Sequence, residues 1–289
     1  MFEHIQQPIC DQKVQLDSTI ELVIKRLDLI HPEISGNKFY KLKYNLLEAK
    51  RLGKKRIISF GGAYSNHIAA TAYAAKLFGF ECIGIIRGEE LANKPLNHTL
   101  ATAERHTMKL EYVSREKYRH KNQAEFLKEL SEKYPESYII PEGGTNALAI
   151  QGCQEILSAQ DLEYDYIACA VGTGGTISGI IEASQDHQKI LGFSALKGDF
   201  LKQEISQWTQ KTNWQITDQY CFGGYAKFSP ELLDFIGEFE QKYQIPLDPV
   251  YTGKMCFGIF ELIKQDYFPK HSRILLIHSG GLQGKGAEH

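Results

Sequence analysis

The sequence predicts an α/β fold built on parallel sheets, and three observations support this prediction. Short apolar runs alternate with helix-prone stretches along nearly all of the 289 residues. Glycine-rich turns separate many of these runs from the helix that follows. The run at residues 165–171, DYIACAV, is almost continuously apolar, as is typical of a strand covered on both faces of a sheet. This alternation favours parallel strands joined by right-handed crossovers.

Each expected element follows from this pattern. Apolar runs bounded by turn residues define the expected strands, which are residues 21–30, 56–60, 81–87, 110–113, 137–140, 165–171, 189–196 and 273–278. Longer stretches between them have helical composition and periodicity, and these are residues 68–78, 96–109, 121–134, 147–157, 177–183 and 230–243. A further helix is expected directly after the segment 35–42. No repeat, low-complexity tract or obvious linker interrupts the pattern, so a second lobe would be interwoven with the first.

Composition and charge argue against several classes of protein. Lys and Arg number 33 and Asp and Glu 35, a net charge of −2, which argues against a nucleic-acid partner. No window approaches about 18 uninterrupted apolar residues, and no basic-then-apolar leader opens the chain, so we expect neither a membrane span nor a signal peptide. The histidines are scattered and no C-x-x-C or H-E-x-x-H pattern occurs, so we expect no metal site. These features together indicate a cytoplasmic protein.

Paired glycines mark the ends of four expected strands. In an open parallel sheet, ligands bind beyond the carboxyl ends of the strands. The sequence GTGGT at residues 172–176 follows a strand and precedes a helix, whose free N–H groups attract anions. The dinucleotide pattern G-x-G-x-x-G fails, because Ile177 stands at the third glycine position, and the Walker pattern is absent. By itself, the turn is equally consistent with an anion site and with a plain tight turn. The four pairs are Gly61-Gly62, Gly143-Gly144, Gly174-Gly175 and Gly280-Gly281.

A set of five ordered motifs narrows the interpretation. They are residues 36–38 (GNK), 61–67 (GGAYSNH), 172–176 (GTGGT), 248–254 (DPVYTGK) and 278–281 (HSGG). Together they resemble the family of 1-aminocyclopropane-1-carboxylate deaminase and D-cysteine desulfhydrase, which are pyridoxal-phosphate (PLP) enzymes of fold type II, the tryptophan-synthase-β type.

The resemblance runs from about residue 10 to about residue 284 and implies an architecture. The fold would be a two-lobed, three-layer α/β/α structure with mainly parallel sheets. Residues 1–41 and 149–289 would form a discontinuous large, cofactor-binding domain, and residues 42–148 a small domain. The resemblance also implies a PLP cofactor, a small amino-acid substrate and a homodimer.

The resemblance implies specific cofactor contacts. Lys38 matches the lysine that forms the Schiff base with PLP, whereas an isolated lysine would usually be a surface charge. Burial and nearby cations would lower the pKa of its amine, which could then remove the substrate α-proton. Lys41 matches a lysine near the cofactor phosphate, with a plain surface lysine as the alternative. The residues that match the phosphate-binding loop are Gly172, Thr173, Gly174, Gly175 and Thr176.

Other matched residues would face the substrate. The resemblance places Asn66 beside the 3′ oxygen of PLP, and Ser65 with its turn around the substrate carboxylate. Either side chain could instead cap the helix that follows. His67 is assigned to the substrate side, with a packing role as the alternative. Tyr251 and Tyr225 match active-site tyrosines, whose hydroxyl groups can donate or accept protons.

Two positions depart from the ring-opening deaminases. Thr252 stands where those enzymes have Glu, although Thr252 could also act only from behind the site. Ser279 stands where they have Leu, and a hydroxyl near the pyridine nitrogen leaves that nitrogen largely unprotonated. Both differences favour β-elimination from D-cysteine or a related β-substituted amino acid, giving pyruvate, ammonia and the leaving group.

Three alternatives remain open. Within the same fold, the first is ring opening of 1-aminocyclopropane-1-carboxylate to 2-oxobutanoate and ammonia, and the second is a synthase that adds a nucleophile to aminoacrylate. The third, from another class, is a non-catalytic protein that binds phosphate or nucleotides through residues 172–176.

Overall fold

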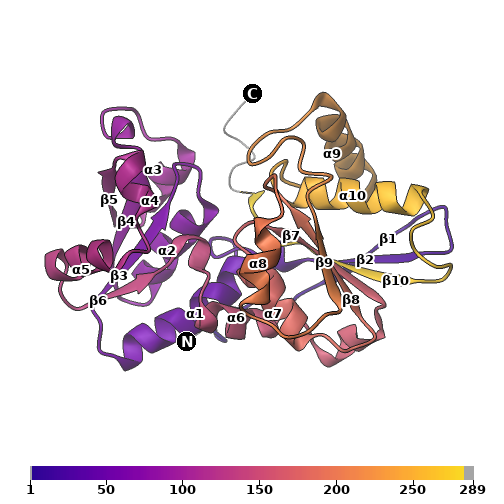
Figure 1. The fold of residues 1–289 in the computed structure, drawn as a ribbon, viewed down its shortest axis with the longest axis horizontal. Helices are drawn as coiled ribbons and strands as arrows, with labels where there is room; N and C mark the ends of the chain where they lie inside the picture. The colour runs from indigo at the N-terminus through magenta and orange to yellow at the C-terminus, as the bar shows by residue number, and fades with distance from the viewer. Residues whose placement is uncertain (1, 283–289) are drawn as a thin grey trace.

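A computed structural model describes residues 2–282, which form two sheets in separate lobes (Figure 1). In the larger sheet every neighbouring pair is parallel except β1 and β2. This arrangement confirms the predicted α/β fold with mainly parallel sheets. The strands, in spatial order, are β1 (Asp11–Val14), β2 (Glu21–Lys25), β10 (Arg273–Ile277), β7 (Tyr166–Val171), β8 (Lys189–Ser194) and β9 (Trp214–Thr217).

The smaller sheet is entirely parallel and comes from one stretch of the chain. The borders predicted for the small domain, at residues 42 and 148, fall inside α1 (Asn37–Arg51) and α6 (Ala147–Gln154), which pack against each other. They therefore stay a prediction. The strands, in spatial order, are β5 (Met108–Val113), β4 (Glu81–Arg87), β3 (Arg56–Gly61) and β6 (Ser137–Ile140).

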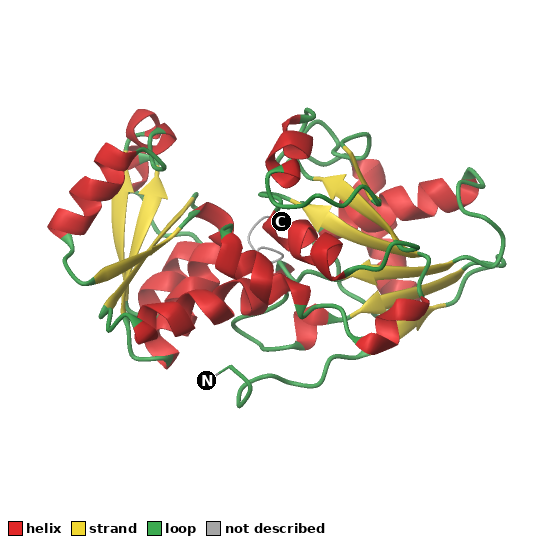
Figure 2. Cartoon of the chain, turned by 60° about the horizontal axis from the view of Figure 1, so that its bottom comes forward, coloured by secondary structure: helices red, strands yellow, loops and turns green. Residues whose placement is uncertain are grey.

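Helices pack beside both sheets (Figure 2). On β7, Ile167 and Cys169 join one apolar cluster while Ala168 and Ala170 join another, so both faces of this strand are covered. This burial explains the unbroken apolar run of β7. No helix within residues 2–282 is long and apolar enough to cross a membrane. The remaining helices are α2 (Asn66–Leu77), α3 (His98–Arg105), α4 (Arg115–Arg119), α5 (Ala124–Lys133), α7 (Gly175–Ala183), α8 (Phe200–Ser206), α9 (Pro230–Tyr243) and α10 (Thr252–Lys264).

Several predicted boundaries were wrong. The helix expected after residues 35–42 begins within them, at Asn37, and the helix predicted at 147–157 ends at Gln154. The helix predicted at 96–109 ends at Arg105, because Thr107 adopts a left-handed conformation (φ 65°) and the chain enters β5 at the next residue. The single helix predicted at 121–134 is instead α5, which begins only at Ala124 and is preceded by α4. The strand predicted at 21–30 ends at Lys25 and continues as a 3-10 turn.

Five helices and strands were not predicted at all, and one of them is the short helix α4. The strands β1 and β9 have only four residues each and lie at the edges of the larger sheet, and β1 is mostly polar. The helix α8 has seven residues. The helix α10 is apolar around most of its circumference, so its sequence lacks a clear polar face.

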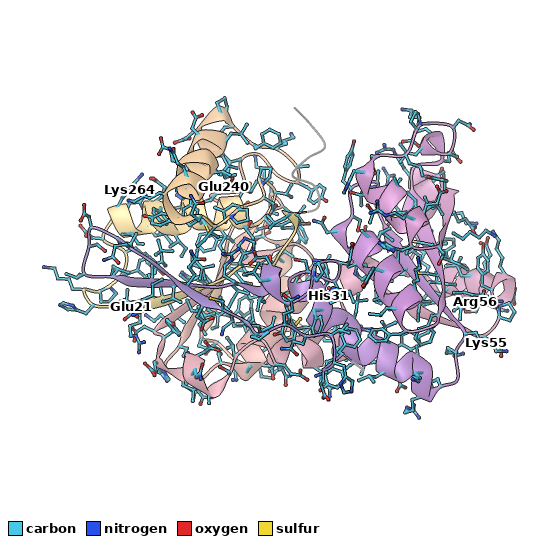
Figure 3. All side chains as sticks on the ribbon, turned by 180° about the vertical axis from the view of Figure 1, so that it is seen from behind. Glu21, His31, Lys55, Arg56, Glu240 and Lys264 are labelled. Carbon is cyan, nitrogen blue, oxygen red and sulfur yellow. The ribbon has the colours of Figure 1, made fainter. Side chains whose placement is uncertain are left out.

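The strand directions place a site between the lobes. Glu21 at the start of β2 and Arg56 at the start of β3 lie toward opposite outer sides of the molecule (Figure 3). The parallel strands of both sheets therefore run inward, and their carboxyl ends approach the space between the lobes.

Candidate active site

A cavity of about 550 Å³ lies at these carboxyl ends. Its volume is within the range of about 300–1,000 Å³ that is usual for small-molecule sites. Each of the four paired-glycine turns contributes to its wall, through Gly62, Gly143, Gly174 and Gly280. Every residue assigned from the sequence to the cofactor or substrate also lines this cavity, except Gly175.

Lys38 lies in the first turn of α1, which begins directly after Gly36. A side chain at Gly36 would place its Cβ 1.9 Å from the Ser279 carbonyl oxygen, and the residue has φ 66°, so only glycine fits this approach. The half-buried Lys38 donates from Nζ to Asn37 Oδ1 at 2.6 Å, and Asn37 Nδ2 donates to Thr176 Oγ1 at 2.7 Å. These two hydrogen bonds connect the lysine to the glycine turn before α7.

The electrostatic surroundings of Lys38 suit a reactive amine. Burial, and then the positive charge of Lys41, lower the pKa of Lys38 to about 7. A large fraction of this amine is therefore neutral near neutral pH, as a nucleophile or a base requires. A surface lysine would not have this property.

Lys41 is buried and connects the two lobes. Its Nζ donates to the Gly143 carbonyl oxygen at 2.7 Å, to Thr145 Oγ1 at 3.1 Å and to Thr173 Oγ1 at 3.3 Å. Burial lowers its pKa to about 8. The alternative of a surface lysine is wrong, because only 3% of the residue is exposed.

The turn at residues 172–176 leaves its backbone donors free. Gly174 is the N-cap of α7 in the left-handed conformation (φ 82°), and no side chain caps the helix. Within residues 2–282, no protein acceptor takes the N–H groups of residues 173–176. These donors, the positive end of α7 and the Lys41 ammonium group together form a fitting cradle for a phosphate.

The turn before α2 has a cap and one unsatisfied acceptor. Ser65 is the N-cap, and its Oγ accepts from the Ile68 N–H at 3.3 Å, so the capping role is confirmed while Ser65 still lines the cavity. The Oδ1 atom of Asn66 is buried and has no hydrogen-bond partner in the described part of the chain. A buried acceptor that faces a cavity favours a ligand that supplies a donor or a water-bridged contact.

His67 is buried and neutral. Burial, followed by the charges of Lys38 and Lys41, lowers its pKa well below the usual value. The Ser59 hydroxyl donates to the Ile140 carbonyl oxygen, so His67 Nε2 donates to Ser59 Oγ at 2.8 Å. Its Nδ1 is then an unprotonated acceptor without a partner among residues 2–282. The packing role is therefore present, since the ring is buried and hydrogen-bonded to Ser59.

Tyr251 and Tyr225 lie edge to face, with ring centroids 6.2 Å apart. Burial, and then Tyr225, raise the pKa of Tyr251 well above its usual value, so its hydroxyl stays protonated. Tyr225 is 45% exposed at the mouth of the cavity. A side chain at Gly172 would come within 3.2 Å of the Tyr251 ring, so glycine there leaves room for the phenol.

The two positions that depart from the deaminases have different surroundings. Thr252 is fully buried, donates from Oγ1 to Asp248 Oδ2 at 2.7 Å and accepts from the Asp248 N–H at 2.9 Å. It does not line the cavity, so it acts only from behind the site. Ser279 does line the cavity, and its carbonyl oxygen accepts from the Asn37 N–H at 3.2 Å.

The Arg26–Asp28 ion pair and the His278 ring support the Ser279 loop from behind, and His278 Nδ1 accepts from the Gly280 N–H at 3.3 Å. His278 Nδ1 lies 3.3 Å from Asp28 Oδ1, and Arg26 binds both carboxylate oxygens of Asp28, at 2.9 and 2.7 Å. His278 Nε2 contacts the Pro246 carbonyl oxygen at 2.7 Å. All three ionisable side chains are buried.

Three further polar residues line the cavity that were not predicted from the sequence. Asn37 adjoins Lys38 in its motif, whereas Arg87 and Glu142 end or follow apolar strands. A charged residue at such a strand end was the signal that could have identified the last two. Within residues 2–282, no group of three or more His, Cys, Asp or Glu side chains could hold a metal ion.

The cavity thus brings a lysine amine of lowered pKa close to an uncapped helix start, between two mainly parallel sheets. Residues 10–280 match the family described as "Pyridoxal-phosphate dependent enzyme", and the chain belongs to this family. PLP is therefore its cofactor, and the phosphate cradle fits that group.

The relatives come from the group that the five motifs indicate. A "Putative 1-aminocyclopropane-1-carboxylate deaminase" of Thermotoga maritima is 32% identical, over 92% of this chain and 90% of that protein. A "D-cysteine desulfhydrase" of Yersinia pestis is 28% identical, over 93% and 89%. The crystal structure of an "ACC deaminase homologue" has a TM-score of 0.84 at 25% identity, covering 97% of this chain and 91% of that one. The resemblance found in the sequence is thus confirmed, and the non-catalytic alternative is disfavoured.

Proposed function

We propose that the protein is a PLP-dependent lyase that acts by β-elimination on D-cysteine or a related β-substituted small amino acid. The Cα–H and Cβ–X bonds break, and the electron pair of the Cβ–X bond leaves with X. The released three-carbon enamine takes up water, so that the amino acid and water give pyruvate, ammonia and HX. Relatives named D-cysteine desulfhydrase support this reaction.

One observation carries the choice of elimination: the polar group at position 279 on the cavity wall is a hydroxyl. Glu142 is the sole carboxylate among the described lining residues, and it is held by Tyr118 at 2.7 Å and Lys121 at 3.1 Å. A hydroxyl partner leaves the pyridine nitrogen largely unprotonated. Such a cofactor suits a reaction whose developing charge departs with a leaving group.

Each residue then has a defined task. When bound, PLP withdraws electrons from the substrate α-carbon. Lys41 and the N–H groups of residues 173–176 hold the cofactor phosphate. The neutral amine of Lys38 accepts the α-proton. The protonated Tyr251 hydroxyl donates to the leaving group.

The turn before α2 orients the substrate. The Asn66 and His67 N–H groups donate to no acceptor within residues 2–282, so they are available to the substrate carboxylate, together with the Ser65 hydroxyl. The positive end of α2 favours an anion there.

Ring opening of 1-aminocyclopropane-1-carboxylate is the second candidate. Two observations favour it, namely the name of the Thermotoga maritima relative and that of the solved structural neighbour. The two reactions have different products, because ring opening gives 2-oxobutanoate and ammonia whereas elimination gives pyruvate.

The test compares products on the PLP-loaded protein. D-cysteine, L-cysteine, D-serine and 1-aminocyclopropane-1-carboxylate are each supplied, and sulfide, pyruvate and 2-oxobutanoate are measured. We expect sulfide and pyruvate from D-cysteine. Formation of 2-oxobutanoate without sulfide or pyruvate would replace the lyase by the deaminase.

The role of Lys38 is tested by trapping. Borohydride should fix the cofactor to Lys38 in the parent chain, and Lys38→Ala should lose at least about 10³-fold in activity. Lys50→Ala, at an exposed lysine of the same helix, is the matched control. Trapping at another lysine would contradict the assignment.

We also propose that the protein works in the cytoplasm as a homodimer, as the family resemblance implies. Light scattering of the purified PLP-loaded chain should give a mass of about twice 32.8 kDa, and a monomer would contradict the proposal.

A further inference from the structure

Arg87 lies beside the substrate end of the cavity. In the parallel pair of β3 and β4, Gly61 pairs with Ile86, so Gly62 and Arg87 are neighbours just beyond the last pair. One guanidinium nitrogen lies 3.4 Å from the position that a Cβ on Gly62 would occupy. Arg87 lines the cavity and is exposed at its mouth.

Among the described residues, the guanidinium group contacts an aromatic ring but no carboxylate. Within residues 2–282, Arg87 makes neither a hydrogen bond nor an ion pair, although it lies 5.9 Å from the ring centroid of Tyr118. The nearest lining carboxylate, Glu142, is already bound by Tyr118 and Lys121. By contrast, the arginines that contact a carboxylate at 3.3 Å or less are Arg26, Arg51, Arg56, Arg115 and Arg273.

The charges in the cavity wall leave Arg87 available. Lys41 is used by the phosphate cradle, and about half of the Lys38 amine is neutral near pH 7, because its pKa is lowered to about 7. The substrate α-carboxylate has the Asn66 and His67 N–H groups under the proposed function. A guanidinium group is always protonated and matches the oxygens of a carboxylate, phosphate or sulfonate. A permanent cation therefore remains on the substrate side with no anion assigned to it.

We propose that Arg87 binds an oxyanion on the β-substituent of the substrate, so that the preferred leaving group is anionic. This inference rests on the proposed β-elimination and names its substrate class: alanine that carries a phosphate or sulfonate group on Cβ. The Cα proton passes to Lys38, the Cβ–X electron pair departs with phosphate or sulfite, and no oxidant or reductant is needed. Tyr118 supports the guanidinium group and so reduces the entropy lost on binding.

A binding experiment tests the inference without turnover. The PLP-loaded protein is titrated with 2-amino-3-phosphonopropionate and with alanine, both as racemates, and the change in visible absorbance gives each Kd. We expect the phosphonate to bind at least about 10-fold more tightly than alanine. Arg87→Met should remove this preference and change alanine binding by less than about twofold, whereas Arg87→Lys should retain part of it.

Two controls accompany these variants. Arg115→Met removes an arginine that is paired with Glu90 and does not line the cavity, and it should retain the full preference. The Tm and bound PLP of each variant establish that it is folded and loaded. If Arg87→Met weakened the binding of alanine and of the phosphonate equally, Arg87 would bind the α-carboxylate, and the inference would be overturned. Unchanged affinity for both ligands would also overturn it.

A kinetic comparison identifies the oxyanion. O-phosphoserine and 3-sulfoalanine are compared with serine and D-cysteine by pyruvate release, with phosphate or sulfite measured in parallel. We expect Arg87→Met to lower kcat/KM about 10- to 100-fold for the anionic substrates alone. If no amino acid yields pyruvate while the Arg87-dependent binding preference persists, the proposed elimination fails and the oxyanion site stands.

Discussion

The turn at residues 172–176 and the turn at residues 61–66 both follow a buried parallel strand and lead into a helix, but they complete the helix start differently. Gly174 provides no cap for α7, and the N–H groups there find no acceptor within residues 2–282. Ser65 caps α2 through its hydroxyl. A buried ammonium group, that of Lys41, donates to Thr173 in the first turn.

Under the proposed function, one local design serves two ligands. The uncapped α7 depends on an external anion to satisfy its donors, which suits a permanently bound cofactor phosphate. In α2, the Ser65 hydroxyl already accepts from one N–H group of the first turn. This helix start therefore stays capped when a substrate binds or leaves. We therefore expect changes at the turn before α7 to affect PLP binding, and changes at the turn before α2 to affect substrate binding.

The largest expected effect comes from removing the Lys41 charge. Lys41→Met should weaken PLP binding by about 10- to 150-fold, because a charged hydrogen-bonding partner of the phosphate is lost. Titration of the apoprotein with PLP, followed by visible absorbance, measures this. Lys43 lies on the same helix as Lys41 and pairs with Glu155 at the end of α6. Lys43→Met breaks this pair and should leave the PLP affinity unchanged. Equal losses in both variants would show that α1 stability, and not the cradle, was affected.

A matched pair of glycine substitutions compares the two turns directly. Gly175→Ala would place Cβ 2.7 Å from Thr145 Oγ1 and 3.2 Å from Lys41 Cε, so it should displace the cradle and weaken PLP binding about 10-fold. Gly62→Ala meets only the flexible end of Arg87 at 3.4 Å and should leave the PLP affinity within about twofold. A larger loss of PLP from Gly62→Ala than from Gly175→Ala would reverse the assignment of the two turns.

Removing the α2 cap should separate stability from substrate binding. Ser65→Ala should cost about 1 kcal/mol and lower the Tm by about 2–4 °C. It should also raise KM for the amino acid while PLP affinity is kept. Ser229→Ala removes the equivalent cap of α9, away from the cavity, and should lower the Tm similarly with KM unchanged. A KM shift in Ser229→Ala would mean that helix stability alone accounts for the effect.

The smallest expected effect is a shift in pH dependence. Under the proposed function Lys38 reacts with PLP as the neutral amine. Because its pKa is lowered to about 7, the rate of PLP capture should rise with pH and level off above that value. In Lys41→Met a neighbouring positive charge is gone, the protonated form of Lys38 is less disfavoured, and the midpoint should move to higher pH. Stopped-flow absorbance from pH 6 to 9 follows the midpoint. An unchanged midpoint would leave burial as the sole cause of the lowered pKa.

Local patterns predicted much of the fold and the site. Strand ends with paired glycines were found because a tight turn at a strand end demands glycine wherever it occurs in the chain. The short edge strands β1 and β9 were missed, since their pairing depends on distant neighbours. The residue type at Thr252 was used to predict the substrate, yet its hydroxyl donates to Asp248 and does not reach the cavity. A comparison of residue types between relatives does not show such a contact.

The sequence by itself determined the alternation of strands and helices and the glycine turns, because each depends on residues that are close along the chain. It also predicted Lys38 as the reactive lysine, through the family resemblance. Only the tertiary structure decided which side chains are charged, paired or free. Lys41 is buried by the turn after β6 and the turn before α7. Within residues 2–282, Arg87 has no carboxylate partner, because Tyr118 and Lys121 already bind Glu142. Burial and pairing are properties of neighbours in space, and these set the pKa of Lys38 and the charge offered to a substrate.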